Sequence, residues 1–185
     1  MKLSKVISFL TKRKISEEKL AESFTAGILQ LVDIGFPEVA LLINEDPELE
    51  IAPTISANAA DKFLLIIIAG NLLYVPKLFN NYQDVRLVES VFNKLSTALN
   101  IDKEKLKQLV ASYQSYMNCI NMPSKNIHYA MSKAVFFKYE LNQYQDSYFR
   151  NMNSPNPLFL KRLDDIVEHF IWNWEEIKSK YKLVE

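Results

Sequence analysis

The chain has 185 residues, 49% hydrophobic and 12% aromatic, a composition that argues against intrinsic disorder and predicts one domain with a sizeable core. Lys plus Arg and Asp plus Glu both total 22, so no net charge favours nucleic acid as a partner. Only three glycines occur, too few for a nucleotide-binding loop or for the many tight turns of an all-β chain.

The first 14 residues predict a basic amphipathic helix. They contain five Lys or Arg residues, no acid, and one aliphatic stripe, Leu3, Val6, Ile7 and Leu10. Polar residues interrupt the stripe, so the segment lacks the continuous apolar core of a signal peptide. Four aliphatic side chains bury little, and Lys2 stands where N-myristoylation requires glycine. We therefore expect this segment to cover the domain rather than to bind a membrane surface.

The next region predicts one long and one short helix. Ser16 is a suitable N-cap for a helix that ends at Gly35, because glycine commonly terminates helices. A short helix is expected from Pro37 to Ile43. The following segment, 44–56, is rich in acids and proline and predicts the longest loop.

The stretch from Asp61 to Phe79, DKFLLIIIAGNLLYVPKLF, decides the class of the protein. Its apolar run, 63–75, would extend about 20 Å as a helix, less than the roughly 30 Å of a bilayer core, so it is not a membrane span. A buried strand is the rival interpretation, but no comparable run is available to build a sheet. The pattern favours a central core helix over 58–75, capped by Asn58 and kinked or ended by Pro76.

The remaining elements are predicted as amphipathic helices. One begins near Asp84, and another is capped by Asp102 and ends near Asn121. Apolar residues at helical spacing predict two long helices, over 124–150 and over 157–181, the second begun by Asn156 and Pro157. The sequence thus predicts an all-α, single-domain bundle of about seven helices around residues 58–75.

The residues with chemical potential form no established motif. Asp165 and His169 are four apart on one helix, but a di-iron bundle needs two Glu-x-x-His motifs, so neither a metal nor another cofactor is expected. Cys119 and His128 flank a turn without the local signature of a cysteine enzyme. A single cysteine cannot form an intrachain disulfide, which favours a reducing, cytoplasmic location.

The leading functional hypothesis is a non-catalytic module that binds a protein partner or itself. The two long predicted helices carry more apolar and aromatic residues than one packing partner would cover, Phe136 and Trp172 among them. Surplus aromatic residues are typical of interfaces. Complete burial of both helices inside the bundle is the alternative explanation of the same pattern.

The second hypothesis is a small apolar-ligand pocket, serving binding or catalysis, near Asn71 and Tyr74. Gly70 leaves space beside the central helix, and an asparagine in an apolar helix needs hydrogen-bond partners. Tyr74 adds a polar group about one turn later. A bond from Asn71 to the backbone of another helix would explain the asparagine without any ligand.

Overall fold

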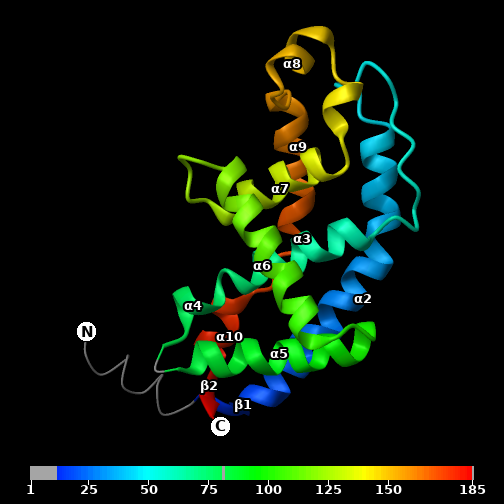
Figure 1. Ribbon diagram of the computed structural model, residues 1–185. Helices are drawn as coiled ribbons and strands as arrows, with labels where there is room; N and C mark the ends of the chain where they lie inside the picture. The colour runs from blue at the N-terminus through cyan, green and yellow to red at the C-terminus, as the bar shows by residue number, and fades with distance from the viewer. Residues whose placement is uncertain (1–11, 81, 185) are drawn as a thin grey trace.

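The computed structural model describes residues 12–80 and 82–184, and it confirms the predicted all-α class. Helices form almost all of the regular structure, and two short strands pair beside the C-terminus (Figure 1). One continuous cluster of buried hydrophobic side chains extends from Leu20 to Leu183.

Helix α2 (Glu17–Asn44) is longer than predicted. The Ser16 hydroxyl accepts a hydrogen bond from the Lys19 N–H, which confirms the predicted cap. The predicted end at Gly35 and the separate helix after Pro37 are wrong, because α2 continues through both residues. Its buried face includes Phe36, Val39, Ala40 and Ile43, and burial of these side chains offsets the backbone hydrogen bond that a proline removes.

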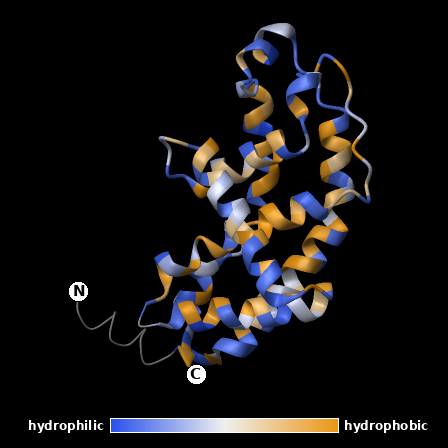
Figure 2. Cartoon of the chain, in the orientation of Figure 1, coloured by the Kyte–Doolittle hydropathy of each residue, from blue (hydrophilic) through white to orange (hydrophobic). Residues whose placement is uncertain are grey.

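Helix α3 (Asp61–Leu72) is the central core helix, as predicted, and its residues from Ile66 to Leu72 are buried. Figure 2 colours most of its ribbon as hydrophobic. Its bounds differ from the predicted 58–75. Ala60 occupies the N-cap position without a side-chain hydrogen bond, so Asn58 is not the cap. Pro76 does not end α3; it lies in the first turn of a separate short helix, α4 (Val75–Leu78), where its missing N–H costs nothing.

Helices α5 (Gln83–Leu99) and α6 (Lys103–Ile120) follow, and α5 packs along α2. The Glu17 carboxylate accepts two hydrogen bonds of 2.8 Å from the Arg86 guanidinium across that contact. Asp102 caps α6 as predicted, accepting from the Lys105 N–H at 3.0 Å.

The predicted helix over 124–150 is wrong as a single element. It divides into α7 (Ile127–Lys138), the 3₁₀ helix η1 (Leu141–Tyr144) and α8 (Ser147–Met152). Glu140 has a left-handed φ of 56°, which ends the α-helical path. Asp146 then caps α8 by accepting from the Tyr148 and Phe149 N–H groups.

The predicted helix over 157–181 also divides. Asn156 caps α9 (Pro157–Glu168) as expected, but the chain leaves the helix before Phe170 and resumes as α10 (Trp174–Lys180), capped by Asn173. Strand β2 (Tyr181–Val184) follows and pairs in parallel with β1 (Arg13–Ser16). Arg13 and Lys14 therefore lie in a strand rather than in the predicted N-terminal helix, and residues 1–11 of that prediction lie outside the described residues.

All three glycines provide space for a large side chain from another element. A Cβ atom built on Gly27 would lie 2.5 Å from the Trp172 ring, and one on Gly35 would lie 2.9 Å from the Phe170 ring. A Cβ on Gly70 would lie 2.3 Å from the Met131 sulfur. The glycines of α2 and α3 thus set how closely α7 and the α9–α10 connection approach the core helices.

Gly70→Ala is expected to lower the free energy of unfolding by about 1–3 kcal/mol, the usual cost of overpacking. Helix propensity alone would give a gain of about 1 kcal/mol, but Met131 is fully buried and cannot move into solvent. Chemical denaturation of Gly70→Ala, Met131→Ala and the double variant measures the coupling. If the free energy of unfolding falls in the double variant by the sum of the decreases in the two single variants, the proposed clash is absent.

Candidate functional site

Asn71 is fully buried, and its side-chain amide is occupied by backbone groups. Its Nδ2 donates to the Ile67 oxygen at 2.9 Å and to the Phe170 oxygen at 3.0 Å. Its Oδ1 accepts from the Trp172 N–H at 2.7 Å. Asn71 thus holds the non-helical segment between α9 and α10 against the central helix. These bonds to backbone groups satisfy the asparagine without any ligand.

Tyr74 lies half-buried just beyond α3. Burial raises the pKa of its phenol, and a hydrogen bond with the His128 backbone partly opposes that shift. The Lys77 ammonium lies 6.0 Å from the centre of the Tyr74 ring. Neither Tyr74 nor Asn71 lines the pocket that Leu72 and Leu73 form with α5 and α6.

The two aromatic residues predicted at an interface pack inside the fold. Phe136 is fully buried, with ring centres 5.0 Å from Phe137 and 6.1 Å from Phe159. Trp172 is half-buried, beside Gly27 and edge-on to Phe24 at 5.7 Å. Phe136 therefore offers no surface to a partner of the folded chain, and its truncation would report on folding rather than on association.

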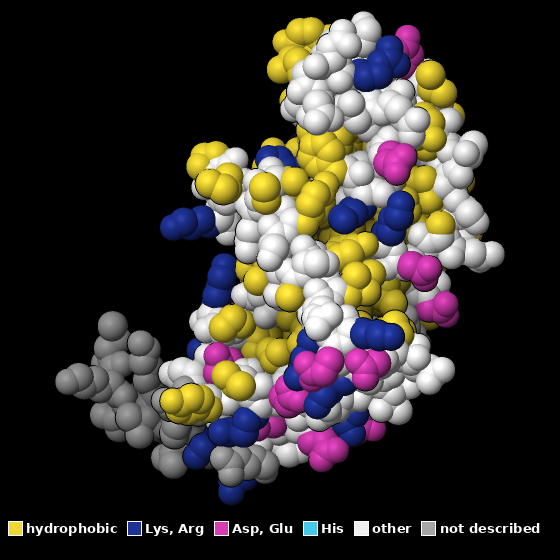
Figure 3. All heavy atoms as spheres, viewed as in Figure 1, with side chains coloured by type: hydrophobic (Ala, Val, Ile, Leu, Met, Phe, Trp, Pro, Cys, Tyr) yellow, Lys and Arg dark blue, Asp and Glu magenta, His cyan; other side chains and the backbone are white. Residues whose placement is uncertain are grey.

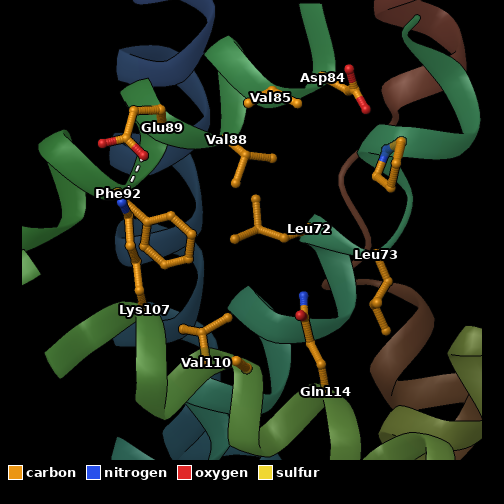
Figure 4. A pocket seen from close by; sticks show the side chains of 12 residues that line it. Leu72, Leu73, Asp84, Val85, Val88, Glu89, Phe92, Lys107, Val110 and Gln114 are labelled. Atoms are coloured by element: carbon orange, nitrogen blue, oxygen red, sulfur yellow. Dashed lines mark ion pairs between the residues drawn. The ribbon is translucent and has the colours of Figure 1, made fainter. Parts of the chain in front are cut away.

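A pocket of about 440 Å³ lies between the end of α3, Pro76 of α4, and helices α5 and α6. Figure 4 shows its aliphatic and aromatic side chains pointing into a common space from three helices: Leu72, Val88, Phe92 and Val110. Val85 of α5 lies at its edge and is 60% exposed. The pocket is thus an apolar recess that reaches the surface.

The geometry of this pocket depends on how α3 ends. The Leu73 N–H donates to the Gly70 oxygen at 3.1 Å, a tighter turn than the α-helical bond to Ala69. The Ala69 oxygen instead accepts from Gln114 Nε2 at 3.1 Å, and Gln114 also lines the pocket. This hydrogen bond joins α6 to α3 beside the pocket. A polar side chain therefore fixes the distance between the two helices whose apolar residues line the pocket.

Charged groups surround the apolar surface. The Glu89 carboxylate forms ion pairs of 2.7 Å with both Lys103 and Lys107, joining α5 to α6. Hydrogen bonds from these two ammonium groups lower the pKa of Glu89, and the bond to Glu89 raises the pKa of Lys107. Asp84 adds a second carboxylate at the first turn of α5. In Figure 3, hydrophobic side chains occupy the recess above α5, and charged side chains of both signs gather over α5 itself.

The candidate reactive groups are dispersed. His128 Nε2 lies 2.6 Å from the Asp164 backbone oxygen, and Cys119, the one cysteine, is exposed. Asp165 and His169 are exposed on α9 and at its end. Within residues 12–80 and 82–184, no group of three His, Cys, Asp or Glu side chains is arranged to hold a metal ion.

Helix α2 has the length and apolar composition to cross a bilayer, unlike the shorter apolar run 63–75. No other helix of the described residues does. A third of its most apolar 18-residue window is buried in the fold. Mostly buried core helices of soluble proteins and signal sequences near an N-terminus meet the same criterion of length and composition.

Sequence reasoning did not identify the pocket between α3, α5 and α6. Its residues are the ordinary apolar positions of helices, and the sequence carries no signal for the end of α3 at Leu72, because Pro76 lies in the first turn of α4. No protein-family model matches the chain, and neither the curated proteins nor the solved structures provide a match.

Proposed function

We propose that the protein is a non-catalytic helical binding module, and that the pocket between α3, α5 and α6 takes an apolar side chain of a protein partner. The observation that carries this proposal is the pocket itself: an apolar recess of about 440 Å³ that opens to solvent beside charged residues. Interfaces commonly have such an apolar centre, filled by an aliphatic or aromatic anchor and surrounded by a polar rim.

Exposed apolar residues at the start of α5, one of them at the pocket edge, support a protein partner. Val85 is largely exposed at the pocket edge, and Tyr82, also exposed, precedes α5. A partner that covers these two side chains while filling the recess would bury more apolar surface than a ligand confined to the pocket. The Glu89–Lys107 ion pair lies outside the apolar floor and can remain hydrated at the rim.

A small apolar ligand is the second candidate. A volume of about 440 Å³ falls within the roughly 300–1,000 Å³ typical of ligand pockets. Native mass spectrometry of the purified protein separates the two candidates, because a small ligand would appear as an added mass that is lost on unfolding.

Ala111→Phe is expected to block the pocket without unfolding the protein, because Ala111 is exposed on α6 and lines the recess. With a photoreactive residue at position 85, a cross-linked partner should form in cells, and Ala111→Phe should reduce it at least tenfold. The melting temperature should stay unchanged, as is usual for a surface substitution.

The matched control places the same photoreactive group at Met152 of α8, which is 57% exposed and far from the pocket along the chain. Cross-linking there should not respond to Ala111→Phe. An equal yield from position 85 with and without Phe at position 111 would contradict the proposed function.

A further inference from the structure

Helix α2 carries a second exposed apolar surface, independent of the pocket. Four large aliphatic side chains stand out from its central and C-terminal part: Leu31, Ile34, Leu41 and Leu42, exposed by 36%, 68%, 52% and 47%. At 100° per residue they fall within roughly 100° of the helix circumference. We call these four residues the α2 face. Glu38 and Glu45 fall within the same sector, so the surface combines aliphatic side chains with carboxylates. Exposed aliphatic residues grouped on one side of a helix are typical of a helix-binding surface.

The stretch of sequence that contains the α2 face carries charges of one sign only. From Leu20 to Asp61 the sequence contains no Lys, Arg or His, and its acids are Glu22, Asp33, Glu38, Glu45, Asp46, Glu48, Glu50 and Asp61. Arg162 neutralises Asp46 through two bonds of 2.6 Å, beyond the C-terminal end of α2. The side chains of Asp33, Glu38 and Glu45 form no ion pair or hydrogen bond within the part of the chain that the structure describes.

This charge pattern selects among the surfaces that could cover the α2 face. Glu38 lies between Ile34 and Leu41 on the same side of the helix, so two copies packed antiparallel would bring their Glu38 carboxylates together. An anionic membrane would repel the same carboxylates. A basic partner surface avoids both the repulsion between two copies and the repulsion by an anionic membrane. Its cations would pair with Glu38 and Glu45 while its aliphatic groups cover the exposed aliphatic residues.

We propose that the α2 face binds an amphipathic helix of a partner protein, with aliphatic residues along one side and Lys or Arg close enough to that side to reach Glu38 and Glu45. The aliphatic residues of that helix lie on Ile34 and Leu41, and its cations pair with Glu38 and Glu45. This is the helix-on-surface mode of peptide recognition, in which apolar contacts provide affinity and charge provides selectivity.

The test uses two synthetic helical peptides with identical leucine stripes, one with lysine and one with glutamate at the remaining positions. Fluorescence anisotropy with the full chain should show saturable binding of the leucine–lysine peptide that weakens with added salt. The leucine–glutamate peptide should bind at least tenfold more weakly. Hydrogen exchange should slow within 31–45 when the leucine–lysine peptide is added.

Two double variants separate the contribution of charge to binding from the contribution of apolar contact. Glu38→Lys with Glu45→Lys should lower affinity for the leucine–lysine peptide at least tenfold, and Ile34→Ser with Leu41→Ser should do the same. The matched control, Met122→Ser with Met152→Ser, removes two exposed apolar side chains elsewhere and should bind as the wild type does. All of these side chains are exposed, so the melting temperatures should remain close together.

Five outcomes would overturn the proposal. Equal binding of both peptides, or unchanged binding by the Glu38→Lys/Glu45→Lys variant, removes the charge argument. A dimer of the wild type that Ile34→Ser/Leu41→Ser dissociates makes a second copy the occupant. Binding to phosphatidylcholine or phosphatidylserine vesicles that the same variant abolishes makes it a membrane. Tighter peptide binding by Lys2→Glu with Lys5→Glu in the full chain makes the protein's own N-terminal segment the occupant.

Discussion

Ile67→Asp is expected to prevent folding. Ile67 is completely buried in α3, and α2, α6 and α7 all contact this helix. Loss of a buried isoleucine costs about 2–5 kcal/mol, and an unpaired buried carboxylate adds several kcal/mol more. The sum is comparable to the whole stability of a typical domain, about 5–15 kcal/mol. Circular dichroism should show no cooperative thermal transition.

Ile34→Asp is the matched control, since it makes the same replacement on α2 at a side chain that is 68% exposed. The introduced carboxylate remains hydrated, so the free energy of unfolding should fall by no more than about 1 kcal/mol, most of it from the lower helix propensity of aspartate. A soluble Ile67→Asp protein that melts as cooperatively as Ile34→Asp would show that α3 is not the centre of the core.

Asn71→Ala is expected to lower the free energy of unfolding by about 3 kcal/mol or more. The substitution leaves the Phe170 oxygen and the Trp172 N–H without their partners, and each unsatisfied buried group costs about 1–3 kcal/mol. For a chain of this length the melting temperature should fall by roughly 6–12 °C.

Tryptophan fluorescence gives this variant a local readout. The chain has two tryptophans: Trp172 lies in the segment that Asn71 holds, and Trp174 begins α10 directly after it. A red shift of the emission at temperatures below the main transition should accompany release of the segment. Asn118→Ala, on the exposed side of α6, should melt within about 2 °C of the wild type. If Asn71→Ala behaves as Asn118→Ala does, the three hydrogen bonds are not needed for stability.

The sequence by itself determined the features that depend on neighbouring residues. Ser16, Asp102 and Asn156 cap helices as predicted, because each side chain accepts from an N–H only two or three residues away. The apolar run around Ile67 determined the central helix, since a helix that is hydrophobic on every side must be surrounded by protein.

Contacts between distant residues decided where the helices end. The hydrophobic pattern continues past Glu140 and past Phe170, yet the chain leaves the helix at both places. At the second break, Phe170 and Trp172 occupy the space beside Gly35 and Gly27, and Asn71 replaces the lost helical hydrogen bonds. At Pro37 the opposite occurs, because burial of the neighbouring face keeps α2 helical. None of these partners is close in sequence.

The same distinction applies to the candidate sites. The sequence indicated that Asn71 needs hydrogen-bond partners and that the chain has surplus apolar residues, because both follow from residue type and spacing. Only tertiary packing decided that Asn71 binds backbone, that Phe136 is buried, and that Leu31, Ile34, Leu41 and Leu42 remain exposed. Periodicity places apolar residues on a helix face, but burial depends on which other elements cover that face, and this only the fold determines.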